Sequence, residues 1–384
     1  MARISLECLY GNGVFKETLV RAITDGRLSH AYLFEGVQGS GKATAAFLSA
    51  ATLCCTSEEV RPCMQCPTCR KILSAQSPDL SVIGLDALPF DGHDPAKPTE
   101  KPRSIGVDAI RALRSDAYIL PNDLEYKLYI IGHADRMTVQ AQNALLKILE
   151  EPPTGAVFFL LCENRAALLP TVLSRVQRLN MEQFSDDALY ALLCRYDREA
   201  SMLSARDDAL LRLYVRLADG AYGRALFYVH AQKKELAQDE AYAAHEGAMQ
   251  CLALLFADSY SDDSPVLRGG EGVLERPSLT SVAARITSLL PGKDGAENRS
   301  RLRALTGALC VAVRDLTMCA CGVEGQLLFY PSHEQPAVLA ARCRAKTLSD
   351  TGRALCVLLE DMDANPNVGM LTRSLAGVLM GLRR

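Results

Sequence analysis

The sequence predicts an α/β fold in its first half, a parallel sheet with helices on both faces, followed by a mostly helical second half. Short apolar, β-forming runs alternate with longer helical patterns in the first half, which is typical of a parallel sheet. The first of these runs leads through a glycine-rich loop into a helix. From about Ser185 onward the strand signals fade, and Ala- and Leu-rich helical periodicity dominates.

The individual elements follow from these patterns. The runs expected to form strands are Ala31–Glu35, Leu80–Leu85, Lys127–Ile131 and Val157–Cys162. The helices expected between them are Lys42–Leu53, Val107–Ala117 and Thr138–Leu149. In the second half, Asp207–Leu217 and Arg299–Arg314 have helical periodicity. The segment Asp258–Pro277 is rich in Ser, Asp, Gly and Pro, and we expect a surface loop or linker there.

Length and composition bound the class of protein. The chain has 384 residues, which predicts two or three domains because single cores stop growing at roughly 250 to 300 residues. With a net charge of −3, the chain lacks the excess of basic residues that a protein needs to neutralise many phosphates alone. No run reaches the ~18 apolar residues of a membrane span, and Met1–Tyr10 lacks a signal-peptide core. We therefore expect a cytoplasmic protein without a membrane segment.

The glycine-rich loop predicts a phosphate-binding site. It lies between a strand and a helix, where backbone N–H groups can cradle phosphates and a lysine can reach them. The residues expected to contact a nucleotide are Gly36, Gly39, Ser40, Gly41, Lys42, Ala43 and Thr44. Ala43 stands where a Ser or Thr hydroxyl would bind magnesium, and Thr44 lies a further ~100° around the helix. The loop predicts ATP binding without a magnesium ligand at this position.

The carboxylate pair that an ATPase needs is missing. Such a pair follows an apolar strand, where one carboxylate organises magnesium and the other activates water. Here the run Lys127–Ile131 ends in Gly132 and His133. Glycine has no side chain to bind magnesium, and a histidine is a weaker, pH-dependent base than a carboxylate. Asp135 is interpreted as a helix-capping or solvated residue. Ala43, Gly132 and His133 all differ from the residues of a working ATPase site. We therefore predict that the chain no longer hydrolyses ATP.

The cysteines indicate a metal site. Fourteen cysteines in a chain of this class favour reduced thiols or metal ligands over a disulfide scaffold. The spacing of Cys54, Cys63, Cys66 and Cys69 allows their thiolates to surround zinc tetrahedrally at ~2.3 Å. Cys55 is an alternative to Cys54, because the two are adjacent and a helix end can present either. A closed four-thiolate site leaves no open position, which disfavours a redox role.

These motifs resemble, in order over about the first 230 residues, those of the clamp-loader AAA+ family of bacterial DNA polymerase III. The resemblance is carried by Gly26–Phe34, the cysteine module, Asn143–Pro153, Leu173-Ser174-Arg175 and Gly220–Leu226. Val176 departs from the family's Ser-Arg-Cys motif. The family usually has a Thr or Asn sensor near the end of the fourth strand, and the residues Cys162, Glu163 and Asn164 leave that sensor unassigned.

The resemblance implies three domains. A Rossmann-like AAA+ P-loop domain would span 1–180, with the zinc module at 54–69 inserted in it. A small helical lid would span 181–238, and an all-α collar for oligomerisation would span 239–384. The collar is implied by the family alone, because the sequence there shows only helical character.

The resemblance also implies a function. The family forms a ring of ATPase motor subunits of the gamma/tau type, a clamp-opening delta subunit and a delta-prime subunit, which often lacks a working ATPase site but keeps an arginine finger. The altered positions fit the delta-prime type. Arg224 would then be the lid's sensor arginine, and Arg175 would act in trans on ATP held by a neighbouring motor subunit. The implied cofactors are structural zinc and unhydrolysed ATP; the implied partners are the other subunits, the sliding clamp and primed DNA.

Two alternatives stay open. An active motor subunit of the same family would need a carboxylate at the position of Gly132 or His133, and the chain has none there. A zinc-containing nucleic-acid-binding module on a P-loop scaffold predicts DNA binding by the isolated chain. The pI near 6.1 counts against that second alternative.

Overall fold

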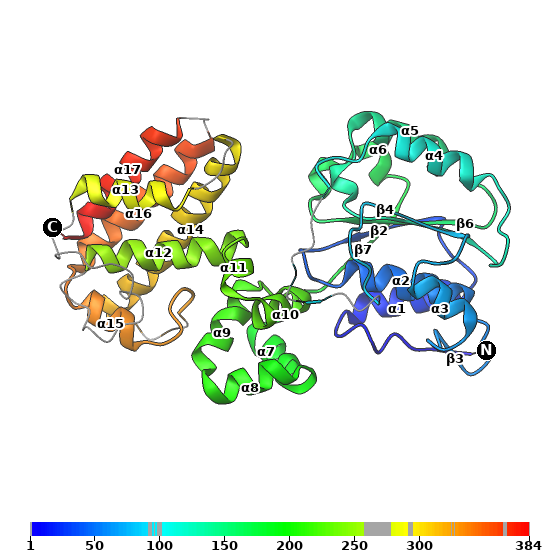
Figure 1. The fold of residues 1–384 in the computed structure, drawn as a ribbon, viewed down its shortest axis with the longest axis horizontal. Helices are drawn as coiled ribbons and strands as arrows, with labels where there is room; N and C mark the ends of the chain where they lie inside the picture. The colour runs from blue at the N-terminus through cyan, green and yellow to red at the C-terminus, as the bar shows by residue number, and fades with distance from the viewer. Residues whose placement is uncertain are drawn as a thin grey trace. The chain divides into compact units, whose positions relative to one another are not determined.

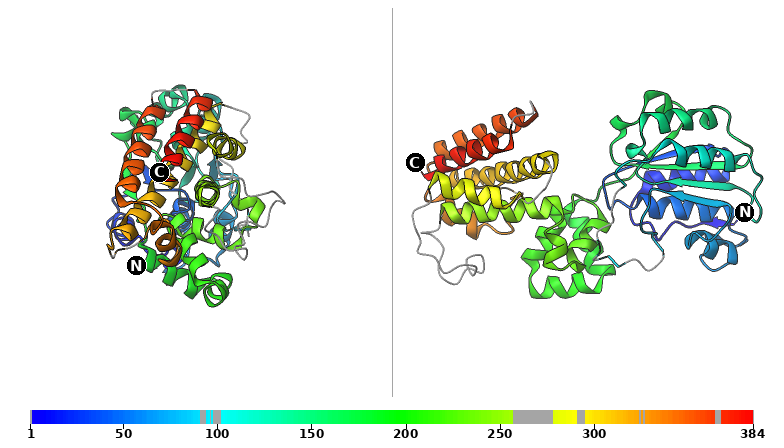
Figure 2. Two further views of the ribbon diagram at one scale, coloured as in Figure 1. Left: turned by 90° about the vertical axis from the view of Figure 1, so that its left-hand side faces the viewer. Right: turned by 45° about the horizontal axis from the view of Figure 1, so that its top comes forward.

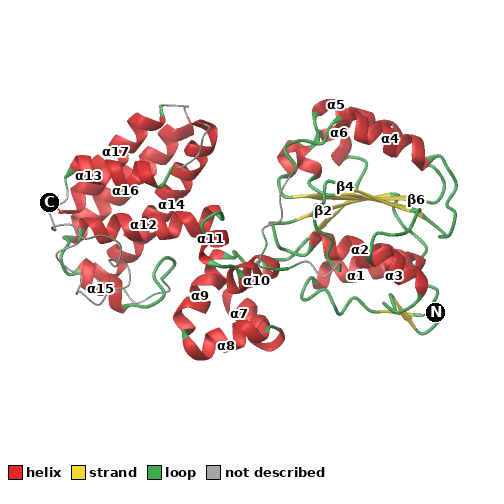
Figure 3. Cartoon of the chain, in the orientation of Figure 1, coloured by secondary structure: helices red, strands yellow, loops and turns green. Residues whose placement is uncertain are grey.

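The computed structural model describes residues 2–90, 94, 95, 97, 102–256, 278–290, 295–323, 325, 327–363 and 367–383. The loop expected at Asp258–Pro277 lies outside the described residues. The chain forms two compact units. The first comprises Met1–Ser201 and Ala218–His230, and the second comprises Met202–Leu217 and Ala231–Arg384. Among the described residues, the strands all belong to the first unit (Figure 3).

The first unit is built on a five-stranded sheet with the order β4-β5-β6-β2-β7, in which all neighbours run parallel. The strands are β2 (Ala31–Glu35), β4 (Leu80–Ile83), β5 (Lys127–Ile131), β6 (Ala156–Cys162) and β7 (Gln177–Asn180). Glu35 at the end of β2 is level with Cys162 of β6 and Asn180 of β7. The predicted parallel sheet is confirmed, and the carboxyl ends of these strands form one edge.

The central strands are buried along almost their whole length, as expected for a parallel sheet covered on both faces. Successive side chains point to opposite faces. Phe34 and Phe159 belong to the core under one face, with ring centroids 5.6 Å apart. Tyr129 and Phe158 belong to the core under the other face and stack at 4.9 Å. The apolar runs therefore supply both halves of the core.

Helices cover both faces of this sheet, as Figures 1 and 2 show. One face packs against α1 (Gly13–Thr24), α2 (Lys42–Cys54) and α3 (Pro67–Leu73). The other packs against α4 (Val107–Ala117), α5 (Val139–Glu150) and α6 (Pro170–Leu173). The 3₁₀ turns η1 (Ala134–Arg136) and η2 (Arg165–Ala167) follow β5 and β6. A separate two-stranded sheet pairs β1 (Arg3–Ile4) with β3 (Val60–Arg61) in parallel.

Four helices follow β7, in the region expected to form a lid. They are α7 (Asp186–Tyr196), α8 (Arg198–Arg206), α9 (Asp208–Leu217) and α10 (Tyr222–His230). In the first unit, α7 packs against α10. The boundary between the two units falls inside α8, after Ser201, and α9 belongs to the second unit. The expected lid range 181–238 is therefore shared between the two units.

The remainder of the second unit is helical in its described residues, which agrees with the expected all-α region. Its further elements are α11 (Lys233–Leu236), α12 (Glu240–Leu255), α13 (Leu279–Ser288), α14 (Gly295–Ala320), α15 (Glu334–Ala340), α16 (Ala345–Asp363), α17 (Val368–Met380) and η5 (Gly381–Arg383). Leu309, Leu355 and Leu375 are fully buried in the core that these helices share. Among the described helices, none is both long and apolar enough to cross a membrane.

Candidate nucleotide site and metal centre

Two glycines of the loop between β2 and α2 have close neighbours. Gly39 has a φ of +79°, in the left-handed region that favours glycine. A Cβ atom at Gly39 would lie 2.5 Å from the backbone nitrogen of Arg224. A Cβ atom at Gly36 would lie 2.7 Å from Ser40 Oγ and 2.8 Å from Met181 Cβ. The main chain of the loop is therefore closely packed against its surroundings at both glycines.

Lys42, the first residue of α2, folds back onto this loop. Its Nζ donates hydrogen bonds to the carbonyl oxygens of Gly36 at 2.7 Å and Val37 at 2.8 Å. Ser40 Oγ is buried and has no hydrogen-bond partner among the described residues. A buried hydroxyl without a partner is costly unless water or a ligand satisfies it. The loop and its lysine fit a phosphate-binding site.

The next two residues of α2 do not restore the magnesium ligand at the expected position. Ala43 and Thr44 are both partly buried. Ala43 has no side-chain oxygen. Thr44 has a hydroxyl, but it projects from the helix ~100° away from its neighbour.

The end of β5 has no room for the missing carboxylate. A Cβ atom at Gly132 would lie 2.4 Å from Leu85 Cδ2 and 2.8 Å from the carbonyl oxygen of Gly84. His133 has a φ of +48°, and its Nδ1 lies 4.0 Å from Glu163 Oε1. A larger residue at position 132 would therefore require the backbone of the β4 loop to move.

The side chains near the ends of β5 and β6 differ in their surroundings. Asp135 lies in η1, and its buried Oδ1 has no hydrogen-bond partner among the described residues. Cys162 is buried at the end of β6, where burial, followed by the charge of Glu35, raises the pKa of its thiol to about 12. Asn164 Oδ1 accepts a hydrogen bond from the amide of Ala166 and so caps η2.

The start of α10 lies against the glycine-rich loop. The amide of Gly223 donates a hydrogen bond of 2.9 Å to the carbonyl oxygen of Gly39. The backbone of Arg224 is the nearest neighbour of Gly39, as described above. The Arg224 guanidinium lies 5.7 Å from the centroid of the Tyr228 ring, within cation–π range. The structure therefore brings the main chain of the expected sensor arginine to the expected phosphate loop.

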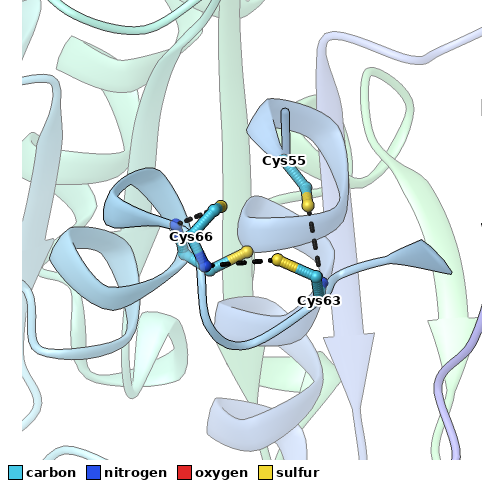
Figure 4. Close-up of side chains that lie close together, drawn as sticks. Cys55, Cys63 and Cys66 are labelled. Carbon is cyan, nitrogen blue, oxygen red and sulfur yellow. Dashed lines mark hydrogen bonds between the residues drawn. The ribbon is translucent and has the colours of Figure 1, made fainter. Parts of the chain in front are cut away.

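The cysteine module places four thiols together. The Sγ atoms of Cys55, Cys63, Cys66 and Cys69 all lie within 4.8 Å of one another. Figure 4 shows Cys55, Cys63 and Cys66 of this cluster. Cys55 and Cys69 are buried, and Cys63 and Cys66 are partly buried. Four sulfur ligands at such separations fit a tetrahedral zinc ion.

Backbone amides of the module donate hydrogen bonds to three of these sulfur atoms. The amide of Cys63 donates to Cys55 Sγ at 3.4 Å, that of Cys66 to Cys63 Sγ at 3.3 Å, and that of Cys69 to Cys66 Sγ at 3.3 Å. For Cys66, burial favours the neutral thiol, but the hydrogen bonds from Cys69 and Thr56 outweigh it and lower its pKa to about 6. Donors of this kind lower the pKa of Cys63 and Cys66 and favour the thiolate form in which cysteine binds metals, whereas burial raises the pKa of Cys55 and Cys69.

The fourth thiol is Cys55 and not Cys54, which corrects the set expected from spacing. Cys54 is the last residue of α2, and its side chain is buried in the core of the first unit, where burial raises its pKa to about 12. Cys55 caps the helix with an extended ψ of 130°, so the chain turns away from the helix at this residue. The spacing left both residues open, and the direction of the chain after α2 distinguishes them.

Arg175 lies two residues after α6 and just before β7. Its Nη2 lies 2.7 Å from Oε1 of Glu150, the last residue of α5. Its Nη1 donates to the carbonyl oxygen of Thr171 at 2.9 Å and to Ser174 Oγ at 3.1 Å. About a third of the side chain is exposed. Glu150 belongs to the segment Asn143–Pro153 that carries the family resemblance, but its contact with Arg175 could not be found from the sequence.

The chain is similar to subunits of bacterial DNA polymerase III. The family model described as DNA polymerase III, delta subunit matches residues 11–185. The DNA polymerase III subunit delta' of Bacillus subtilis is 32% identical over 265 residues, which cover 63% of this chain and 75% of that protein. The chain thus spans three quarters of this relative.

Other relatives carry a different subunit name. The DNA polymerase III subunit tau of Bacillus subtilis is 31% identical over 221 residues, covering 57% of this chain and 36% of that protein. The gamma/tau subunit of Mycobacterium tuberculosis is 31% identical over 201 residues, covering 52% of this chain and 32% of that protein. The chain spans about a third of these two relatives. A solved structure of a gamma subunit-related protein from Thermotoga maritima has 17% identity and a TM-score of 0.44 over 96% of this chain and 99% of that chain.

Proposed function

Because this chain belongs to the clamp-loader AAA+ family of bacterial DNA polymerase III, we propose that it is the delta-prime type of subunit. In this role it is a ring member that does not hydrolyse ATP itself. It supplies an arginine finger, Arg175, to the ATP site of a neighbouring subunit. Its partners are motor subunits of the gamma/tau type and a delta subunit, which together load the sliding clamp onto primed DNA.

The observation that carries this proposal is the end of β5. A hydrolysing site needs a carboxylate for magnesium and a second for the attacking water at this edge of the sheet. Gly132 supplies neither, and a Cβ atom there would lie 2.8 Å from the carbonyl oxygen of Gly84. His133 supplies no carboxylate, and Ala43 no hydroxyl. The motor alternative needs groups that these positions lack.

The nucleotide site supports binding of ATP without turnover. Gly36, Gly39 and Gly41 keep the loop tight, so that its backbone N–H groups could approach a phosphate. Lys42 would have to exchange its hydrogen bonds to loop carbonyl oxygens for bonds to the phosphates. Arg224 would approach the same loop from α10. When bound, ATP would stabilise the folded first unit by mass action.

Zinc is proposed as a structural ion held by Cys55, Cys63, Cys66 and Cys69. The fit rests on four thiols within 4.8 Å of one another and on amide donors directed at three of their sulfur atoms. The module also lies beside the N-terminal strand, because the amide of Arg3 donates to Glu59 and that of Ser5 to Arg61. An ion there would therefore stabilise the local fold rather than take part in the chemistry.

Arg175 is proposed as the one residue of this chain that takes part directly in ATP hydrolysis. A planar guanidinium with several N–H donors can stabilise the charge that develops on a transferred phosphate. The residue follows α6, in the segment that resembles the family's Ser-Arg-Cys motif.

As parts of the same proposal, the AAA+ domain spans 1–180, the lid 181–238 and the collar 239–384, with assembly through the collar.

Reconstitution tests this function. The chain would be mixed with a gamma/tau-type subunit, a delta subunit, the sliding clamp and primed DNA, and clamp loading would be measured with and without it. We expect loading to depend on the chain, and the chain alone to hydrolyse no ATP. Steady magnesium-dependent turnover by the chain alone at ~1 s⁻¹ or faster, within the ordinary enzyme range, would favour the motor alternative.

A further inference from the structure

The helix α5 holds the segment that carries Arg175 at two points. Near its start, the buried side chain of Gln142 donates to the carbonyl oxygen of Ala167 at 3.0 Å and accepts from the amide of Leu169 at 2.7 Å. At its end, Glu150 pairs with Arg175 itself. Val172 of α6 is fully buried in the same core as the inner side of α5. The backbone around Arg175 is therefore fixed relative to α5.

Among the described residues, one of the polar contacts of the Arg175 side chain reaches a separate element. Its bonds to Thr171 and Ser174 lie within its own turn and move with it. The pair with Glu150, at 2.7 Å, comes from α5 and favours one direction of the guanidinium relative to the sheet. Among the described residues, these three contacts use three of the five guanidinium N–H groups. Two N–H groups are left for a phosphate.

We propose that Glu150 is a positioning residue, which holds the Arg175 guanidinium in the orientation that a neighbouring subunit's ATP requires. This inference rests on the proposed role of Arg175 in trans. A free arginine side chain samples many rotamers, and ordering it at the moment of reaction raises the barrier. A guanidinium already paired with a carboxylate of another element avoids part of that ordering, as a supporting residue does for other preorganised sites.

The ion pair between Arg175 and Glu150 is expected to contribute little to the stability of the folded chain. The side chains of Arg175 and Glu150 are 34% and 48% exposed. Ion pairs with this exposure contribute little to folding, because solvent screens them. Loss of Glu150 should therefore change the melting temperature very little, and we expect its effect on ATP hydrolysis to come from the orientation of Arg175.

The test measures ATP hydrolysis by the complex assembled with primed DNA and clamp. Glu150→Ala should lower kcat about three- to tenfold, leaving the KM for ATP unchanged, because the contact acts in the transition state. Glu150→Gln should lose less, since its amide oxygen can still accept a hydrogen bond. Glu151→Ala is the matched control, because Glu151 is the exposed neighbour at the helix end. It should keep the unmodified rate.

A double variant separates positioning from a structural role. If Glu150 acts through Arg175, the variant with both residues changed to Ala should hydrolyse ATP at the rate of Arg175→Ala alone. A further loss in the double variant, or an unmodified or higher rate for Glu150→Ala, would overturn the positioning role. If Arg175→Ala itself has no effect, the proposed finger is wrong, and that outcome is distinct from failure of Glu150 alone.

Discussion

The amide of Gly223 donates a hydrogen bond of 2.9 Å to the carbonyl oxygen of Gly39, which joins the first turn of α10 to the glycine-rich loop. The two segments are far apart in the sequence, yet a Cβ atom at Gly39 would lie 2.5 Å from the backbone of Arg224. The loop that would hold phosphates is thus in direct contact with the helix that carries the proposed sensor arginine. Both parts belong to the first compact unit.

Gly39→Ala should destabilise the first unit by about 1 to 3 kcal/mol, because the new methyl group meets backbone and the position has a φ of +79°. Urea unfolding followed by circular dichroism would measure this. Gly13→Ala is the matched control, since a Cβ atom there has no neighbour within 4 Å and the residue begins α1. Equal stability of the two variants would contradict the close contact between α10 and the loop.

Gly132→Asp should not create an ATPase. The side chain would meet Leu85 and the carbonyl oxygen of Gly84, and we expect a loss of about 1 to 3 kcal/mol in the free energy of unfolding. Gly106→Asp serves as the control, because Gly106 is the N-cap of α4 and a Cβ atom there meets nothing within 4 Å. An unaltered stability for Gly132→Asp, together with magnesium-dependent turnover, would mean that the site is close to active.

One zinc ion per chain is expected by elemental analysis of protein never exposed to chelator. Cys55→Ser and Cys66→Ser should each lose the metal and more than about 2 kcal/mol of stability in the module, because the binding energy of a structural zinc is folding energy. Cys54→Ser should keep the metal, since its thiol lies in the core and outside the cluster. Metal retained in Cys55→Ser but lost in Cys54→Ser would restore the set expected from spacing.

The burial of His245 predicts that the stability of the second unit depends on pH. Burial lowers its pKa; the hydrogen bond to Phe329 and the charge of Glu246 oppose this shift, and Arg216 adds to it. The folded state therefore binds the proton less readily than the unfolded state. The contribution of His245 to the free energy of unfolding is fully present above about pH 6.5, the pKa of histidine in the unfolded chain. Below that pH the free energy of unfolding falls by up to about 1.4 kcal/mol per pH unit. Calorimetry between pH 5 and 8 should show this slope, and His245→Gln should reduce it. An unchanged slope in the variant would assign the dependence to other groups.

Much of the fold could be predicted because its strands are apolar runs bounded by turn signals. Lys127–Ile131 and Val107–Ala117 have the predicted bounds. The strand β7 was missed, because in Gln177–Asn180 only Leu179 is buried and no apolar pattern marks an edge strand this short. The glycine loop was located because its residues are consecutive.

The rest of the site depends on contacts between distant segments. Spacing alone could not choose between Cys54 and Cys55, since that choice depends on the backbone turn after α2. The lack of space at Gly132 comes from Leu85, on the loop after a neighbouring strand. Glu150 reaches Arg175 only because α5 and α6 pack together. Such contacts depend on the folded arrangement and leave no local pattern.

The most direct test of the central claim is the DNA-stimulated ATPase rate of the assembled complex containing Arg175→Ala. Arginine fingers in trans are worth ~10³ to 10⁵ in rate in other phosphoryl-transfer systems, and one finger among several sites should matter less for the total. We predict normal folding, zinc content and assembly, with hydrolysis reduced several-fold, and little rescue by Arg175→Lys because an ammonium cannot reproduce the planar fork. A complex that assembles normally and hydrolyses ATP at the unmodified rate would contradict the account.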